Sequence, residues 1–172
     1  MPADEVVDVV DEDDAVVGSA TLRECLDTGT LHRAVAVVLS RPGGTIVLQK
    51  RSLHDRWQPG RLTLSSTGHV KKGESYEVAA KRELAEELGI VAEVSPLGKK
   101  LIPPITEDGL TEREWVTLFS AISSAPCNID RTELDSVSEH SLQEVESMLT
   151  GAALTTDAVI LLREYLQLSA LR

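Results

Sequence analysis

The sequence has few aromatic side chains and few cysteines. Its 172 residues contain one Phe, two Tyr and two Trp, so aliphatic side chains and alanine must fill the core. The two cysteines, Cys25 and Cys127, lie far apart in the sequence. Two distant thiols exclude a framework of disulfides and favour a reducing compartment, which we expect to be the cytoplasm.

Basic residues are also scarce. Seventeen Lys and Arg stand against 28 Asp and Glu, which gives a net charge of −11. This charge argues against a nucleic acid or an anionic membrane as the partner, because both are polyanions. A small phosphorylated ligand is still compatible with it, since a bound divalent metal reverses the local charge of an acidic site.

Long apolar runs are missing as well. No stretch approaches the roughly 20 apolar residues that a membrane-spanning helix needs. The first residues read MPADEVVDVVDEDD, and this acidic run lacks the features of a signal or transit peptide. We therefore expect neither a membrane span nor a targeting segment in this sequence.

Alternating and helical patterns predict one α/β domain over residues 1–172, with helices packed on a mixed β-sheet. The first element expected is a β-hairpin at about 5–18, whose acidic turn at 11–14 we interpret as solvated rather than metal-binding. Further strands are expected at 32–39, 45–51, 62–66, 91–94, 100–102, 115–122 and 134–141. Helical segments are expected at 21–26, 75–88, 142–149 and 156–168, the last being a long C-terminal helix.

The helix at 75–88 is unusually acidic on one face. Glu83, Glu86 and Glu87 are three and four residues apart, a spacing that brings the three carboxylates together. Like charges at this spacing destabilise a helix by about a few tenths of a kcal/mol per pair, and Arg82 can offset only part of that. A hard divalent cation would neutralise the group. Taken alone, these residues fit a solvated acidic helix face equally well.

The whole segment at 68–90, GHVKKGESYEVAAKRELAEELGI, is more specific. It matches the Nudix box, Gx5Ex7REUxEExGU, at every constrained position. The matching residues are Gly68, Glu74, Arg82, Glu83, Leu84, Glu86, Glu87, Gly89 and Ile90. The chain thus resembles the Nudix superfamily, whose members mostly hydrolyse a nucleoside or other group X linked to a diphosphate. The resemblance implies a Nudix-type α/β/α sandwich with a mixed sheet.

The resemblance also implies a metal site. Glu83, Glu86 and Glu87 would bind Mg²⁺ or Mn²⁺, with the carbonyl of Gly68 as a further ligand. Bound metal of this kind neutralises diphosphate oxygens and lowers the pKa of a water that attacks phosphorus.

Other box residues would have supporting roles. Glu74 and Arg82 would be structural, orienting the carboxylates. A carboxylate must take the proton of the attacking water, and both Glu83 and Glu114 qualify as this general base.

Similarity beyond the box points to one branch of the superfamily. Residues 31–34, 57–60, 65–69 and 112–115 resemble the branch that contains type 1 isopentenyl diphosphate isomerase. That isomerase needs a cysteine directly before its Gly-His pair, where this chain has Thr67. A threonine hydroxyl is far too weak an acid to replace a thiol in proton exchange with carbon. The intact box and the missing cysteine therefore favour a hydrolase.

Several residues outside the box match the isomerase's metal-binding positions. His32 and His69 match two of its metal histidines, and Cys25 occupies the third position. His69 fits a contact with metal or diphosphate and a simple loop hydrogen bond equally well, whereas His32 fits a structural role better. Glu114 is a candidate metal ligand or base. Glu112 points to the same side of a strand and is a further candidate for contact with the metal or substrate.

Cationic residues near the box provide candidates for contact with the distal phosphate. These candidates are Arg51, Arg61, Lys71 and Lys72. For each of them alone, a solvated role explains the residue better.

The sequence thus predicts a Mg²⁺- or Mn²⁺-dependent hydrolase of a small diphosphate molecule, with the group X left open. An isomerase of prenyl diphosphates and a non-catalytic nucleotide-binding module are the two alternatives. A homodimer is compatible with the sequence.

Overall fold

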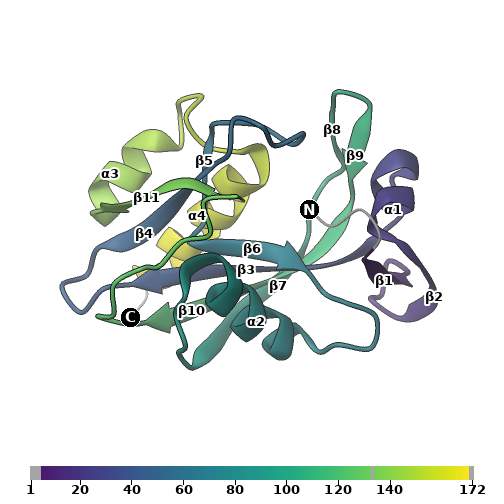
Figure 1. Ribbon diagram of the computed structural model, residues 1–172, viewed down its shortest axis with the longest axis horizontal. Helices are drawn as coiled ribbons and strands as arrows, with labels where there is room; N and C mark the ends of the chain where they lie inside the picture. Colours follow the sequence, from purple (N-terminus) through teal and green to yellow (C-terminus); the bar gives the residue numbers. More distant parts are fainter. Residues whose placement is uncertain (1–4, 133, 171–172) are drawn as a thin grey trace.

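The computed structural model describes residues 5–132 and 134–170 (Figure 1). Within these residues the main sheet has nine strands, which are β1 (Val6–Val10), β2 (Val16–Thr21), β3 (His32–Ser40), β4 (Ile46–Arg51), β5 (Leu62–Thr63), β6 (Ser66–His69), β7 (Val94–Leu101), β10 (Glu114–Ile122) and β11 (Leu134–His140). A separate hairpin consists of β8 (Ile105–Glu107) and β9 (Leu110–Glu112). The helices are α1 (Leu22–Thr28), α2 (Tyr76–Leu88), α3 (Leu142–Met148) and α4 (Thr156–Ser169).

Strand β3 is the centre of the sheet. It runs parallel to β10, with His32 opposite Glu114 at one end and Ser40 opposite Ile122 at the other. On its other side β3 pairs antiparallel with β6, and its two ends meet β1 and β4. The sheet is therefore mixed, as the sequence predicts.

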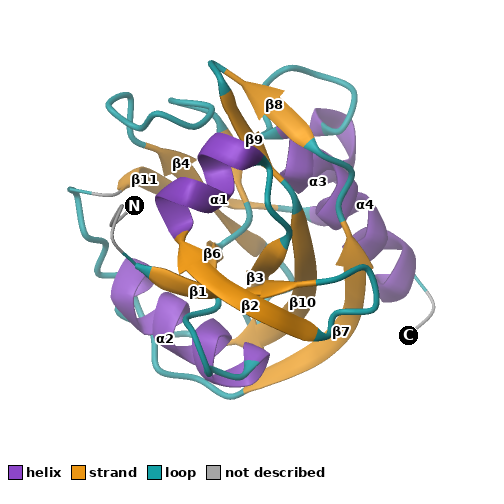
Figure 2. Cartoon of the chain, turned by 90° about the vertical axis from the view of Figure 1, so that its right-hand side faces the viewer, coloured by secondary structure: helices purple, strands orange, loops and turns teal. Residues whose placement is uncertain are grey.

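Alternation along β3 divides the interior into two cores. Ala34, Ala36 and Val38 face the core that α4 covers. Val35 and Val37 face the core that α2 covers. Because successive side chains of a strand point to opposite faces, one apolar strand supplies both cores. The result is a sheet between two helical layers, which confirms the expected α/β/α sandwich (Figure 2).

Helix α2 follows the boundaries that its sequence predicts. The Ser75 hydroxyl accepts a hydrogen bond from the Val78 amide and caps the first turn. Leu84 and Leu88 are fully buried against the sheet. Gly89 ends the helix at φ +64°, a left-handed conformation that glycine adopts at little cost.

Three local predictions were wrong. The single strand expected at 62–66 is two strands, β5 and β6, separated by residues 64 and 65. The segments at 91–94 and 100–102 were expected as separate strands, but Val94–Leu101 forms one strand, β7, paired with β10. Pro96 is tolerated there because β7 is an edge strand and a bulge in the pairing lies beside it. The β8–β9 hairpin was not expected at all, although Asp108-Gly109 is a typical hairpin turn and both residues have positive φ.

The acidic turn between β1 and β2 also differs from expectation at one residue. Asp14 is not solvated: its side chain is 7% exposed and lies 2.6 Å from Arg33 Nε and 2.6 Å from Lys99 Nζ. The Tyr76 hydroxyl donates to the same carboxylate. Burial alone would raise the pKa of Asp14, but hydrogen bonds from Lys99, Arg33 and Tyr76 outweigh it and lower the pKa. Asp14 thus ties the hairpin to β3, α2 and β7.

No helix in the two described ranges, 5–132 and 134–170, has the length and apolar character that crossing a membrane requires.

The role of Asp14 gives a prediction for stability. We expect Asp14→Asn to lower the free energy of unfolding by about 1–3 kcal/mol at neutral pH, because Arg33 and Lys99 lose a buried charged partner. The contribution of a carboxylate with a lowered pKa is present at neutral pH and is lost as pH falls through that pKa. The difference in the free energy of unfolding between wild type and variant, measured by urea unfolding, should therefore become smaller in acid.

Asp13→Asn is the matched control, since Asp13 is exposed in the same turn. It should change stability by less than about 0.5 kcal/mol. An equal loss in both variants would show that Asp14 has no special role.

Candidate active site

A cavity of about 410 Å³ lies between the sheet, α1, α2 and the start of α4. Most of the residues that the sequence singled out line it, namely Gly68, His69, Arg82, Glu83, Glu86, Glu87, Glu112 and Glu114. The box acids come from α2, whereas Glu112 and Glu114 come from the segment where β9 ends and β10 begins. Distant parts of the chain therefore meet in one cavity.

Gly68 allows β6 and α2 to approach closely. A Cβ atom on this residue would overlap the carboxyl carbon of Glu83 and lie 2.6 Å from its Cγ. Only glycine leaves room for the Glu83 carboxylate against the strand. The preceding residue, Thr67, donates its backbone N–H to Glu87 at 3.0 Å. Strand β6 thus fixes two of the three acids.

Arg82 organises the box through hydrogen bonds to four different partners. Its guanidinium donates twice to Glu74, at 2.9 Å from Nε and 2.9 Å from Nη2. The same side chain reaches Glu83 at 2.5 Å, Glu86 at 3.2 Å and the carbonyl of His69 at 3.0 Å. A planar guanidinium suits this task because its donors point in fixed directions. The geometry fits the orienting role expected for Arg82 and Glu74.

Two of the box carboxylates, Glu83 and Glu87, are hard to ionise in this setting. Burial raises the pKa of Glu83 to about 7, although the contacts with Arg82 oppose it. Burial raises the pKa of Glu87 to about 8, with the charge of Glu83 adding to the effect. Glu87 is 7% exposed and has no ion-pair partner among the residues that the structure describes. A cation in the cavity would favour the ionised forms.

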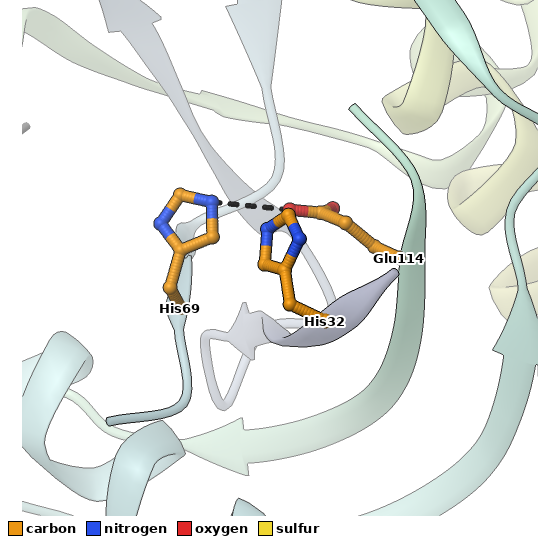
Figure 3. A group of neighbouring side chains, drawn as sticks. All are labelled: His32, His69 and Glu114. Carbon is orange, nitrogen blue, oxygen red and sulfur yellow. Dashed lines mark ion pairs between the residues drawn. The ribbon is translucent and has the colours of Figure 1, made fainter. Parts of the chain in front are cut away.

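A second group of polar side chains surrounds Glu114 (Figure 3). Glu114 Oε1 lies 3.2 Å from His32 Nε2 and 3.1 Å from His69 Nε2. The parallel register of β10 and β3 sets His32 opposite Glu114, and β6 brings His69 beside them. One donor atom from each of the three residues falls within 4.8 Å of the others, a separation at which they could share a metal ion.

Protonation of this cluster follows from its contacts. Burial would lower the pKa of His32, but contacts with Cys25 and Glu114 raise it to about 10. Burial would raise the pKa of Glu114, yet the neighbouring imidazoles of His32 and His69 hold it well below its usual range. Glu114 and His32 therefore form a buried ion pair.

The four cationic residues expected as candidates for contact with the distal phosphate divide into two groups. Arg51 and Lys71 line the cavity, whereas Arg61 and Lys72 do not. Arg51 is already engaged, since it donates to the Trp57 carbonyl and forms an ion pair with Asp55.

Asp157 was missed by the sequence analysis. It lies in the first turn of α4 and lines the cavity. Burial raises its pKa, and the charge of Glu114 raises it further. The sequence shows only an acid near a helix N-terminus, a common position for Asp, and gives no sign that α4 begins at the cavity.

Comparison with known proteins agrees with the fold and the site. Residues 30–162 match the NUDIX domain family. A prenyl-diphosphate phosphatase of Methanosarcina mazei is 35% identical over 143 residues, which cover 83% of this chain and 76% of that protein. An isopentenyl-diphosphate Delta-isomerase of Nocardia farcinica is 37% identical over 111 residues, 63% of each chain. The crystal structure of DR0079 from Deinococcus radiodurans has a TM-score of 0.77 at 23% identity, covering 92% of this chain and 98% of that one.

The chain is thus an enzyme of the phosphoanhydride-hydrolysing class. It belongs to the Nudix family, as a Nudix hydrolase in the branch that includes the isopentenyl diphosphate isomerases. The resemblance stated from the sequence is confirmed.

The Arg82 contacts predict a stability loss on conservative substitution. Arg82→Lys should lower the free energy of unfolding by about 1–3 kcal/mol, because an ammonium cannot reproduce the double donation to Glu74 and the bond to the His69 carbonyl. Arg163→Lys on the exposed face of α4 is the control and should unfold like the wild type. Urea denaturation of the three proteins tests this. Indistinguishable curves would contradict an organising role for Arg82.

Proposed function

We propose that this Nudix hydrolase cleaves the diphosphate linkage of a small organic diphosphate in a metal-dependent reaction. Glu83, Glu86 and Glu87 would hold Mg²⁺ or Mn²⁺ together with the carbonyl of Gly68. The observation that carries the proposal is the convergence of these groups at one end of the cavity. The close contacts of Glu83 and Glu87 with β6 support the proposal further.

The donor set fits a hard divalent cation. All of its members offer oxygen atoms, which Mg²⁺ and Mn²⁺ prefer. The cavity is short of cations next to these acids, since Arg82 divides its charge among Glu74, Glu83 and Glu86 and leaves Glu87 unpaired among the described residues. When bound, the metal would neutralise diphosphate oxygens and acidify a water molecule.

The chain's own residues would orient the substrate and take the proton. Glu83 and Glu114 face the cavity from different elements, and we retain both as candidates for the base. Glu114 is held between His32 and His69, which keeps it ionised and fixes its direction. The same three residues form the second candidate group of metal ligands.

The isomerase alternative is favoured by one observation, the cluster of His32, His69 and Glu114. It is opposed by Thr67, which offers a hydroxyl where the isomerase needs a thiol. Incubation with isopentenyl diphosphate in heavy water separates the two functions. Deuterium in the recovered prenyl diphosphate without phosphate release would establish the isomerase.

The hydrolase itself is tested with a panel of substrates. Nucleotide sugars, dinucleoside polyphosphates and isopentenyl diphosphate are each incubated with Mg²⁺ or with EDTA, and released phosphate or monophosphate is measured. We expect release with Mg²⁺ and none with EDTA. Tight binding without turnover of any compound would favour the binding-module alternative.

Glu87 gives the sharpest prediction for catalysis. Glu87→Gln should lower kcat by at least about a hundredfold, because an uncharged amide is a poor ligand for the metal and the site loses a charge that offsets it. Its melting temperature in metal-free buffer should equal or exceed that of the wild type, since the substitution removes a buried carboxylate that has no ion-pair partner among the described residues.

The matched control is Glu77→Gln, on the exposed face of the same helix. It should retain wild-type activity. Full activity in Glu87→Gln would refute the assignment of the box carboxylates.

Gly68 should control metal affinity. Gly68→Ala places a methyl group where the Glu83 carboxyl lies and must displace it. We expect the Mg²⁺ concentration for half-maximal activity to rise about tenfold or more, in the range seen when groups that position ligands are disturbed. Gly43→Ala, in an open turn, is the control. An unchanged Mg²⁺ requirement in Gly68→Ala would argue against Glu83 as a ligand.

A further inference from the structure

A glutamine side chain lies on the apolar face of β4 that α2 covers. Side chains alternate along this strand, so Ile46 and Leu48 pack in the core under α4, whereas Val47 packs in the core under α2. Gln49 is on the same face as Val47 and is 1% exposed. A buried amide costs free energy unless other polar groups bind it, and an apolar side chain would pack there without that cost. Stability alone therefore favours an apolar residue at this position.

The Gln49 side chain contacts the Glu87 carboxylate. Both residues line the cavity. Burial raises the pKa of Glu87, and the contact with Gln49 is one of those that oppose the rise. A contact lowers the pKa of a carboxyl when it brings a hydrogen-bond donor, so the NH₂ group of Gln49 faces Glu87.

Strand β6 supplies the other polar groups around Glu87. The Thr67 backbone N–H donates to Glu87 Oε2 at 3.0 Å. Ser66 is fully buried and lies beside the same carboxylate. It is on the strand face that Gly68 presents to α2, because residues two apart in a strand share a face. Glu87 is therefore contacted from two strands, β4 and β6.

The other polar end of Gln49 has no partner. Its Oε1 is buried and accepts no hydrogen bond from any residue in the ranges 5–132 and 134–170. A buried amide that lacks part of its hydrogen bonds is uncommon in proteins and lowers their stability. Stability therefore does not explain Gln49, whereas a function toward Glu87 does.

A donor in this place is suited to directing a metal ligand. A glutamate side chain on a helix can rotate about several bonds, and freedom that is lost before binding need not be lost on binding. Donors that are fixed on strands restrict these rotations. Carboxylates that bind metals in proteins are commonly held by such hydrogen bonds, and removal of one weakens metal binding about 10- to 100-fold.

We propose that Gln49 is a positioning residue, which orients Glu87 for binding of the divalent metal without contacting the metal itself. This inference rests on the proposed function, which makes Glu87 a metal ligand, and it adds a residue from outside the Nudix box to that site. Arg82 has the corresponding task for Glu83 and Glu86. The three acids are thus oriented by different groups, an arginine on their own helix and an amide on β4.

The test measures metal binding directly, without substrate. Mn²⁺ is titrated into the metal-free protein, and the free ion is followed by electron paramagnetic resonance. Gln49→Met keeps the length of the side chain and removes its N–H donors. We expect the Kd for Mn²⁺ to be about tenfold higher in this variant than in the wild type. The Mg²⁺ concentration for half-maximal hydrolysis should rise in parallel.

Melting temperatures separate positioning from a structural role. Gln49→Met removes a buried amide whose oxygen is unpaired, so in metal-free buffer its melting temperature should fall by no more than about 3 °C. A large fall together with weaker Mn²⁺ binding would indicate a general disturbance of the core and overturn the proposal. Gln49→Leu repeats both measurements with a different shape, and it decides the question if Gln49→Met does not fold.

Thr117→Val is the matched control. Thr117 is also buried, and its hydroxyl also lacks a hydrogen-bond partner among the described residues. It lies on β10 and is not one of the described residues that line the cavity. This variant should bind Mn²⁺ as the wild type does. A tenfold weakening here as well would show that loss of any buried polar group disturbs the site, and would overturn the specific role of Gln49.

Failure of this inference differs from failure of the hydrolase. Unchanged Mn²⁺ affinity in Gln49→Met and Gln49→Leu overturns the role of Gln49, while metal-dependent hydrolysis by the wild type still stands. If the wild type binds Mn²⁺ but hydrolyses no compound of the panel, the proposed function fails and the Mn²⁺ affinities still decide the inference. A wild type that binds no Mn²⁺ overturns both.

Discussion

The close packing of α2 against β6 is the contact on which the site depends. Gly68 has no side chain, and the Glu83 carboxylate occupies the space where a Cβ would lie. Arg82 then joins the two elements, since it binds Glu74 and Glu83 and also donates to the His69 carbonyl on β6. Without this bidentate clamp, three carboxylates on one helix would repel one another and turn toward solvent.

Strand β3 connects this clamp to the rest of the protein. Its alternate side chains supply the core under α2 and the core under α4, so both helical layers pack against the same strand. Its first residue, His32, meets Glu114 on β10. A mixed sheet is required for this arrangement, because β10 must run parallel to β3 and β6 antiparallel to it for His32, Glu114 and His69 to meet.

The sequence predicted those parts of the site whose geometry is local. Glu83, Glu86 and Glu87 share a helix, so their spacing alone places them on one face. The boundaries of α2 could also be predicted, because Ser75 and Gly89 are typical residues for the N-cap and the C-cap of a helix. Such features depend on neighbours within a few residues and need no knowledge of the fold.

Features that depend on distant contacts could not be predicted in the same way. In the sequence, Asp14 cannot be distinguished from the three exposed acids that precede it. Its burial comes from Arg33, Tyr76 and Lys99, which are far away in the sequence. Asp157 faces the cavity only because Gln58 fixes the start of α4 there. In both cases the residue type gives no signal, and the tertiary partners decide whether an acid is solvated.

The net charge of the protein affects how a diphosphate can reach the cavity. A net charge of −11 opposes the approach of a diphosphate over most of the surface. Inside the cavity, however, the acids fall into two sets with different partners. The α2 set is suited to cations that bridge to phosphate oxygens, whereas Glu114 is paired with His32 and His69. An acidic cavity can therefore bind an anionic diphosphate only if a metal supplies the missing positive charge.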